Sequence, residues 1–236
     1  HCPIEHDERG AETVTGNAAG LAWGSISAEA FDLFRDLLRV DTTNPPGREG
    51  ACAAVLARSL AQDGLESQVL VPQEGRANLV VRLPATHPSG VGPLLLTGHL
   101  DVVPADATHW KHPPFEAVED GGYVYGRGAV DMKNMVAMSA MVMKIFGRAK
   151  LPRDRDIIFA AVSDEEEGCR WGSQWMVEQH PEAVRAEFML GEIGGFPMDV
   201  MGTRFYPVQV AEKGLCWFKL TATADPGHGS MPSAQA

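Results

Sequence analysis

Apolar runs separated by segments of helical periodicity dominate the middle of this chain. The runs at 94–97 and 157–162 are almost wholly apolar, which is typical of strands that a sheet buries on both faces. Further strands are predicted at 67–71, 78–83 and 187–190. Together these runs predict a buried sheet.

Helical segments alternate with the strands. The apolar side chains of the first helix recur at helical spacing: Phe31, Phe34, Leu37 and Leu38. Ser27 can cap this helix, and the turn residues at 44–47 end it. Other helices are predicted at 49–62, 132–146 and 171–179. The alternation predicts an α/β domain with helices on both faces of the sheet.

The pattern changes after Gly202. Two strands, 207–212 and 215–223, are predicted around a Lys-Gly turn, so a hairpin opens a new antiparallel unit. Two strands alone are not stable. We therefore expect the chain to be a fragment, with a loose arm at 1–24, an incomplete first domain at 25–206 and the start of a second at 207–236.

Charge and cysteine usage exclude several classes of function. The formal net charge is −11, which argues against a nucleic-acid partner and leaves no basic patch for an anionic membrane. The four cysteines are scattered and favour neither a zinc ribbon nor a disulfide framework. No apolar run is long enough to span a membrane, and residues 1–10 lack a signal-peptide pattern. Cytoplasmic is therefore the default expectation.

His99 is the first candidate for chemistry, because it follows the apolar run 94–97 directly. A metal-bound imidazole usually donates its other N–H to a carboxylate, and Asp101 stands two residues on. The alternative is a histidine at a strand end that is merely hydrogen-bonded to Asp101.

Asp131 and Glu192 each stand beside glycines that let the backbone approach closely. Asp131 is either the N-cap of the helix that follows or a ligand whose two oxygens can bridge two cations. Glu192 is either a structural turn residue or a carboxylate ligand at the end of the strand 187–190.

Glu165 and Glu166 lie in the acidic run 164–167, immediately after the strand 157–162. Such a run is ordinarily a solvated surface. At a buried strand end, however, its carboxylates repel one another, and either a cation or a raised pKa would relieve that repulsion. Adjacent glutamates can also divide the work, one as a metal ligand and the other as a general base.

All of these candidates follow the carboxyl ends of strands, where open α/β sheets bind their ligands. Imidazole plus carboxylate ligation suits zinc, with Mn²⁺ or Co²⁺ as alternatives. Several carboxylates able to bridge suggest two metals, about 3.5–4 Å apart.

With these residues in view, the chain resembles the co-catalytic zinc metallopeptidase and amidohydrolase family. That family includes aminoacylase, acetylornithine deacetylase, succinyl-diaminopimelate desuccinylase, glutamate carboxypeptidase and the carnosinases. The matching segments occur in the family's order: GHLDVVPA at 98–105, WKHPPFEA at 110–117, YGRGAVDMKN at 125–134, SDEEEG at 163–168, GEIGG at 191–195 and GHGSMP at 227–232.

The resemblance implies a zinc-peptidase-like mixed sheet and two zinc ions per active site. In this pattern His99 looks like a ligand of one zinc and Asp131 like the bridge between the two. Glu166 looks like a further ligand, and Glu192 like the carboxylate ligand of the other metal. The peptide bond that follows Asp131 is expected to be cis.

The resemblance also assigns residues that hold no metal. Asp101 looks like the residue that orients the ligand histidine, and Glu165 like the general base. The second domain would be an α+β lid and dimerisation domain. His228 resembles a lid histidine that stabilises the oxyanion in the partner's site of a homodimer.

Two family features are not assigned within these residues. In the family that the chain resembles, the last histidine ligand comes from a late segment after the lid. No residue here is assigned to it, since His109, His112 and His180 lie in the wrong motifs. The arginine for the substrate carboxylate is also expected beyond Ala236. As a fragment, the chain is expected to bind metal poorly, and its own activity stays open.

The function that follows is metal-dependent hydrolysis of amide bonds in small N-acyl amino acids or peptides. Deacylase and carboxypeptidase or dipeptidase activities need the same zinc chemistry, so the sequence leaves that choice open. A noncatalytic binding or dimerisation protein on the same fold is the competing class. The intact ligand set makes it the weaker hypothesis.

Overall fold

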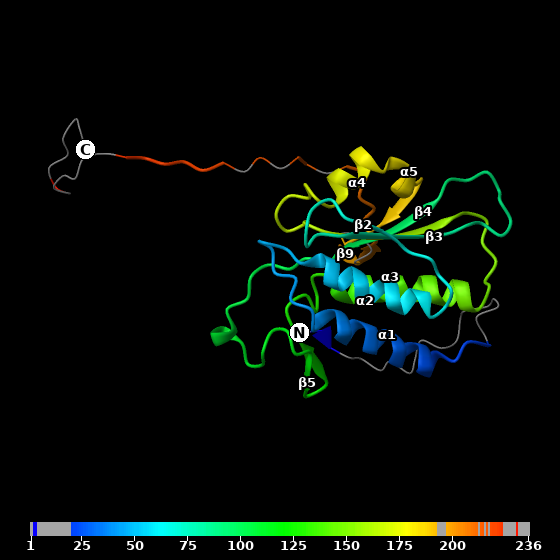
Figure 1. The fold of residues 1–236 in the computed structure, drawn as a ribbon, viewed down its shortest axis with the longest axis horizontal. Helices are drawn as coiled ribbons and strands as arrows, with labels where there is room; N and C mark the ends of the chain where they lie inside the picture. The colour runs from blue at the N-terminus through cyan, green and yellow to red at the C-terminus, as the bar shows by residue number, and fades with distance from the viewer. Residues whose placement is uncertain are drawn as a thin grey trace.

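A five-stranded mixed sheet forms the centre of the protein in this computed structural model, which describes residues 2–3, 20–192, 197–211, 213–214, 216, 218–223 and 230 (Figure 1). In spatial order its strands are β2 (Gln68–Leu70), β3 (Asn78–Leu83), β7 (Ile157–Val162), β4 (Leu94–His99) and β8 (Phe188–Leu190). β4 runs parallel to both β7 and β8, whereas β3 is antiparallel to β7 and to β2. The predicted strands are thus confirmed, with β4 running to the candidate histidine.

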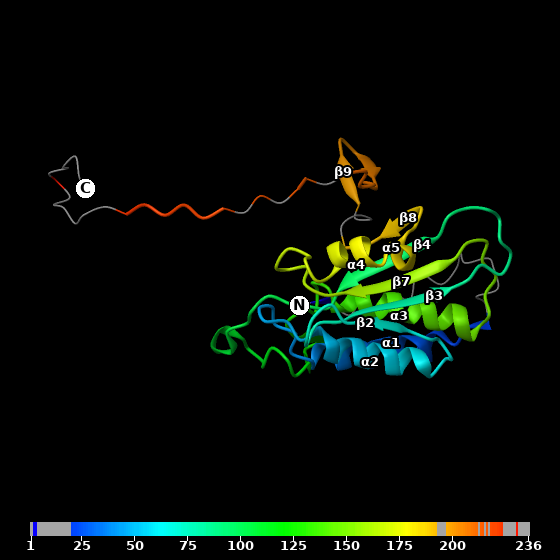
Figure 2. The ribbon, with the colours of Figure 1, turned by 45° about the horizontal axis from the view of Figure 1, so that its top comes forward.

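Helices cover both faces of the sheet, as predicted (Figure 2). One face carries α1 (Trp23–Leu38), α2 (Glu49–Ala61) and α3 (Lys133–Arg148). The other carries the shorter α4 (Ser173–Gln179) and α5 (Pro181–Val184).

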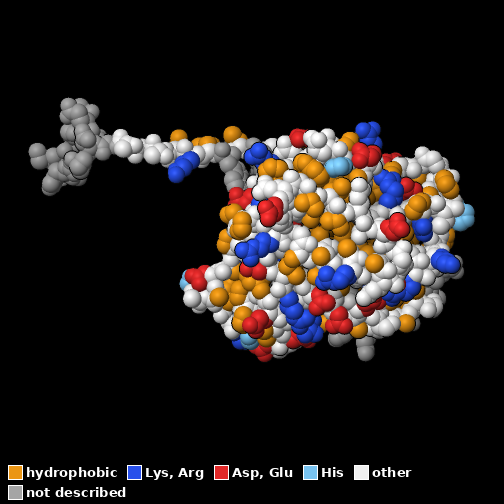
Figure 3. Space-filling view, viewed as in Figure 1, with side chains coloured by type: hydrophobic (Ala, Val, Ile, Leu, Met, Phe, Trp, Pro, Cys, Tyr) orange, Lys and Arg blue, Asp and Glu red, His pale blue; other side chains and the backbone are white. Residues whose placement is uncertain are grey.

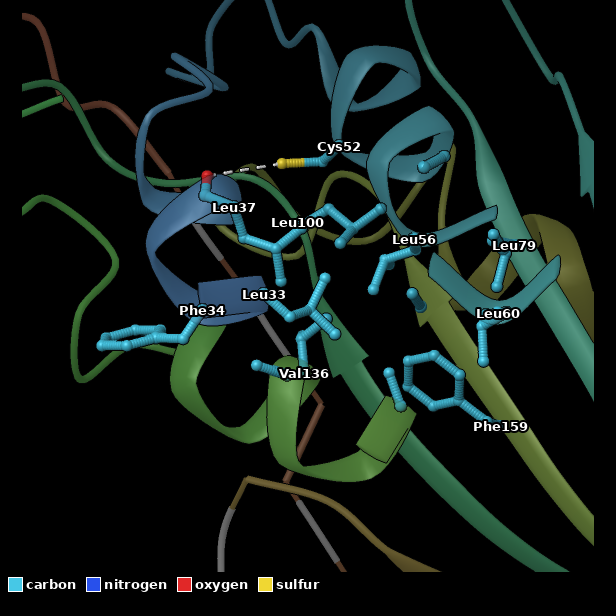
Figure 4. Close-up of a cluster of buried hydrophobic side chains, with 14 of the residues drawn as sticks. Leu33, Phe34, Leu37, Cys52, Leu56, Leu60, Leu79, Leu100, Val136 and Phe159 are labelled. Carbon is cyan, nitrogen blue, oxygen red and sulfur yellow. Dashed lines mark hydrogen bonds between the residues drawn. The ribbon is translucent and has the colours of Figure 1, made fainter. Parts of the chain in front are cut away.

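The core between the sheet and the three long helices holds the largest apolar cluster (Figure 4). Leu37 of α1, Leu56 of α2, Val136 of α3 and Phe159 of β7 are fully buried there. Ile158, the neighbour of Phe159, points to the opposite face and joins the cluster under α4. β7 is therefore apolar at every position because both of its faces are covered. Burial of each of its Ile, Phe and Val side chains contributes roughly 1.5–3 kcal/mol.

The start of α1 differs from the prediction. The helix begins at Trp23, and its N-cap is Ala22, which makes no side-chain capping bond. Ser27 therefore lies inside the helix and is not its cap. The helix begins before Ser27 because Ile26 is buried and continues the packed face of the helix towards the N-terminus. The Ser25 hydroxyl donates to the Ala22 carbonyl oxygen within the first turn.

Several short elements were not expected. Strands β5 (Val118–Asp120) and β6 (Tyr123–Tyr125) form a hairpin on which β1 (Cys2–Pro3) pairs. A second hairpin joins β9 (Met198–Val200) to β10 (Thr203–Phe205), and Ala107–His109 form a 3₁₀ turn. Two- and three-residue strands are too short to show a hydrophobic period, so the sequence pattern missed them.

The hairpin predicted at 207–223 is not formed among the described residues of that stretch. Their side chains are largely exposed, with Val208 at 82% and Phe218 at 79%, and in Figure 1 these residues run away from the sheet. The physical reason is that a two-stranded unit buries too little surface to be stable without a sheet or helix to pack on. The domain boundary after residue 206 stays a prediction.

Two surface properties bear on partners. No helix in the described part of the chain is both long and apolar enough to cross a membrane. On the face in Figure 3, basic and acidic side chains are interspersed, and no continuous basic area is seen.

Candidate metal centre

The candidate site lies where the parallel strands β4 and β7 end side by side. The register places His99, the last residue of β4, beside Val162, the last residue of β7. The acidic turn, residues 164–167, follows this strand end closely and therefore lies near the histidine. This is the edge at which open α/β sheets bind ligands.

Three carboxylates surround one nitrogen of the buried His99 side chain, which is 2% exposed. Its Nε2 lies 2.8 Å from Asp131 Oδ1, 3.8 Å from Glu192 Oε2 and 3.9 Å from Glu165 Oε2. Burial opposes protonation of the imidazole. Hydrogen bonding to the Asp101 side chain, together with the charges of Asp101, Asp131 and Glu165, outweighs burial and raises the pKa of His99 to about 9.

A metal ion fits this arrangement. His99, Asp131 and Glu192 each offer a ligand atom, and these atoms all lie within 4.8 Å of one another. Burial and the charge of Asp131 raise the pKa of Glu192 to about 7. The same two causes raise the pKa of Glu166. The site thus carries more negative charge than its surroundings compensate, which a bound cation would relieve.

Asp131 is not the helix cap that the sequence allowed. The N-cap of α3 is Met132, without a side-chain capping bond, and the Asp131 side chain is 58% exposed. The Asp131–Met132 peptide is cis, as the family resemblance implied. Gly128 has a φ of +89°, and a Cβ there would lie 2.9 Å from Val102 Cγ1, so this loop approaches its neighbour as only glycine allows.

Asp101 contacts His99 differently from the expectation. Nδ1 of His99 lies 2.9 Å from the backbone carbonyl oxygen of Asp101 but 3.5 Å from its carboxylate Oδ1. The carboxylate also accepts hydrogen bonds from the backbone N–H groups of Glu165 at 3.0 Å and Glu166 at 3.1 Å. Asp101 therefore holds the acidic turn as well as the histidine.

A set of buried polar residues beneath the site was missed by the sequence reasoning: Asn44, Glu49, Arg76 and Asp164. Asn44 had been interpreted only as part of a helix stop. Arg76 lies in the loop before β3 and Arg82 lies within β3, and the sequence does not show that Arg76 is buried whereas Arg82 is part-exposed. The hydrogen bonds among Asn44, Glu49, Arg76 and Asp164 join segments that lie far apart in the chain. No local sequence pattern predicts such contacts.

A cavity of about 390 Å³ opens beside the site. Its lining includes Asp131 and Glu166, with Trp110 and Arg127 on its wall. The Arg127 guanidinium lies 5.2 Å from the centre of the Trp110 ring, and its NH2 donates to the Pro104 carbonyl oxygen at 3.3 Å. The volume is within the usual range for a small-molecule site.

The remaining histidines do not join the site in the part of the chain that is described. His109 is largely exposed beside Asp106, and His112 bonds to Asp120. His180 packs on the Trp175 ring. His228 falls outside the described residues, so its predicted role stays a prediction.

Comparison with known proteins decides the family. Residues 95–220 match the model of peptidase family M20/M25/M40. The chain belongs to this family. The M20 chain is 38% identical over 204 residues to aminoacylase-1 of Sus scrofa, covering 84% of this chain and 48% of that protein. It is 33% identical over 199 residues to succinyl-diaminopimelate desuccinylase of Paracoccus denitrificans, covering 83% and 49%.

Solved structures agree on the fold. An M20 family metallo-carboxypeptidase from Sulfolobus solfataricus superposes with a TM-score of 0.60 at 20% identity, covering 74% of this chain and 39% of that one. Human carnosine dipeptidase 1 gives 0.56 at 21% identity, covering 72% and 40%. The zinc-peptidase-like mixed sheet is thus confirmed. This M20 chain spans about half the length of the curated relatives it matches, 48% of the aminoacylase.

Proposed function

We propose that this protein is a metal-dependent amide hydrolase that acts on small N-acyl amino acids or peptides. The observation that carries the proposal is the buried His99, whose Nε2 faces Asp131, Glu192 and Glu165 within 3.9 Å at the end of a parallel strand pair. The family membership supports the same reaction class.

The ligands of two zinc ions would be His99, Asp131, Glu166 and Glu192, with Asp131 as the bridge. Co²⁺ and Mn²⁺ are the alternatives for this donor set. Bound metal supplies Lewis-acid polarisation of the amide carbonyl and a lowered pKa for water. The hydrogen bond from His99 Nδ1 to the backbone carbonyl of Asp101 makes Nε2, which faces Asp131, the nitrogen that would act as the ligand atom.

Glu165 is the general base in this proposal. Its side chain is 45% exposed, and its Oε2 lies 3.9 Å from His99 Nε2, so it reaches both solvent and the ligand cluster. Glu165 would accept the proton of the attacking water and return it to the leaving amine. The Asp101 carboxylate, which accepts from the Glu165 backbone N–H, fixes where this base stands.

Substitution Glu165→Gln tests the base. In the protein expressed from its complete reading frame, we expect kcat to fall by about 10²–10⁴-fold, the usual contribution of a general base. Bound zinc, measured by atomic absorption, should stay at the wild-type level. Glu167→Gln, at the exposed neighbouring carboxylate, is the matched control and should keep full activity. Wild-type turnover in Glu165→Gln would contradict the assignment.

The names of the relatives, an aminoacylase and a desuccinylase, favour removal of an acyl group over cleavage of a peptide. A panel of acetyl, succinyl and long-chain acyl amino acids, assayed beside dipeptides, separates the two. Faster cleavage of dipeptides would favour the carboxypeptidase or dipeptidase alternative. Zinc binding without turnover on any of these compounds would favour the noncatalytic alternative.

Dimerisation through the lid belongs to the same proposal. His228 would reach the partner's site and stabilise the oxyanion there. Light scattering on the protein from its complete reading frame should give twice the monomer mass, and His228→Ala should lower kcat while leaving that mass unchanged. A monomer with full activity would contradict this part of the proposal.

A further inference from the structure

A buried arginine beneath the site links three side chains from separate segments. Arg76 is 7% exposed and precedes β3. Its NH1 donates to Glu49 Oε1 at 2.8 Å and to Asp164 Oδ1 at 2.9 Å, and its NH2 donates to Asn44 Oδ1 at 2.8 Å. A Cβ on Gly47 would lie 2.4 Å from the guanidinium carbon, so glycine is required where the arginine passes.

Asn44 carries the connection onward. Its amide oxygen accepts from Arg76, while its Nδ2 donates to Asp101 Oδ2 at 2.8 Å and to Asp164 Oδ1 at 3.0 Å. A primary amide can accept on one side and donate on the other, which a carboxylate or hydroxyl of this size cannot do for two acids at once. Asn44 is 1% exposed, so water cannot readily replace these hydrogen-bond partners.

The two aspartates, which accept from these side chains, also hold main chain. Asp101 accepts the backbone N–H groups of Glu165 and Glu166. Asp164 Oδ2 accepts the backbone N–H of Trp171 at 3.0 Å, and the Asp164 backbone N–H donates to Glu49 Oε1 at 3.2 Å. The backbone N–H groups of three successive residues of the acidic turn, Asp164, Glu165 and Glu166, are therefore held by buried carboxylates.

The backbone at Asp164 also needs support. Its φ is +64°, in the left-handed region that non-glycine residues rarely adopt. Such a conformation costs of the order of 1 kcal/mol or more and persists where the surroundings over-determine it. The hydrogen bonds from Arg76, Asn44 and Trp171 to its side chain supply that constraint.

We propose that Asn44 and Arg76 are positioning residues, which act through Asp101 and Asp164 to fix the main chain that presents Glu165 and Glu166. They touch neither substrate nor metal. Their effect is to set the direction of the base and of one metal ligand at the same time. The roles of Glu165 and Glu166 rest on the proposed function, whereas the constraint on their main chain does not.

Hydrogen exchange tests the constraint without metal or substrate. In Asn44→Ala, the amides of Glu165 and Glu166 should exchange about ten-fold faster, relative to the core amide of Phe159, because local opening costs less. Lys144→Met is the matched control. Lys144 is as buried, but its Nζ bonds to Ser59 and Glu29 in the helical layer, so the ratio should not change. Unchanged exchange in Asn44→Ala overturns the proposal.

Arg76→Lys covers the case in which Asn44→Ala does not fold. It keeps the buried positive charge but loses the forked geometry that reaches both Asn44 and Asp164. The same acceleration at Glu165 and Glu166 is expected, and its absence in a folded Arg76→Lys protein overturns the proposal.

Cobalt titration of the same variants, in the protein expressed from its complete reading frame, tests the consequence for the site. Asn44→Ala or Arg76→Lys should weaken Co²⁺ binding about ten-fold, as loss of an outer-shell partner typically does, and should alter the visible absorption of the bound ion. Lys144→Met should leave both as in wild type. Faster exchange with unchanged cobalt binding would overturn the positioning role. Failure of wild type to bind cobalt would contradict the proposed function, and the exchange result would still decide the constraint.

Discussion

The two nitrogens of His99 face different partners, and this division determines what the side chain can do. Nδ1 is held by the backbone carbonyl oxygen of Asp101, whereas Nε2 points to the carboxylates. The sequence placed Asp101 beside the histidine but assigned the contact to its carboxylate. The carboxylate has other partners because the backbone N–H groups of the neighbouring turn lie within hydrogen-bond distance.

Gly172 is the clearest steric requirement at the scale of one residue. A Cβ there would lie 1.7 Å from the backbone oxygen of Ser163, which cannot move without moving the acidic turn. We expect Gly172→Ala to lower the free energy of unfolding by about 3 kcal/mol, measured by urea denaturation. Gly24→Ala in α1, where nothing lies within 4 Å, should be neutral or slightly stabilising. Equal stabilities of the two variants would contradict this account.

Ion pairs join the three long helices at the scale of elements. Arg148 of α3 bonds through both terminal nitrogens to Glu29 of α1 and also to Asp63, just past α2. The buried Lys144 Nζ lies 2.6 Å from Glu29 Oε1. A network that shares two cations between two acids constrains three helices at once, unlike an isolated surface pair.

This network predicts a pH dependence. The hydrogen bond from Arg148 is the main cause that lowers the pKa of Glu29 from 4.5 to about 2. Because the folded pKa is depressed, the stabilisation is fully present above about pH 4.5 and is lost as the pH falls towards 2. Urea denaturation between these limits should show a smaller loss of stability in Glu29→Gln than in wild type.

The control for that experiment is Asp36→Asn on the same helix. Asp36 pairs only with Arg39 at the exposed surface, so its removal should leave the acid limb of the stability profile unchanged. If Glu29→Gln loses stability with falling pH as steeply as wild type, the network does not contribute as described.

Metal binding should appear as a property of the whole molecule. A ligand that binds only the folded state stabilises it by about 2.7 kcal/mol at a concentration 100 times its Kd. In the protein expressed from its complete reading frame, we therefore expect added zinc to raise Tm and a chelator to reverse the rise. The shift should vanish in His99→Ala and persist in His109→Ala, because the His109 side chain is 82% exposed and lies beside Asp106. A shift that survives in His99→Ala would place the zinc elsewhere.

The boundary after residue 206 has a proteolytic test. The described residues beyond it are exposed and form neither helix nor strand, and Lys213 and Lys219 are trypsin sites among them. Limited trypsin digestion should cut there first and leave a core that keeps its circular dichroism. A first cut between residues 20 and 192 would argue against the boundary.

The amino-acid sequence determined the sheet, its two helical layers and the strand ends at which the candidate ligands stand. It could do so because strand and helix periods are local, and because parallel strands end at a common edge. Its expectations for Ser27 and for the hairpin at 207–223 were wrong, since packing rather than propensity sets such boundaries.

Only the tertiary structure decided how the site is held. Asn44 meets Asp101 across 57 positions and Asp164 across 120. No local sequence pattern predicts either pairing, because an asparagine at a turn and an aspartate in an acidic run are both ordinarily found on exposed surfaces. Folding buries both together, and in that environment each must find a partner. The candidate residues for the chemistry were therefore predictable from the sequence, whereas the buried residues proposed to position them were not.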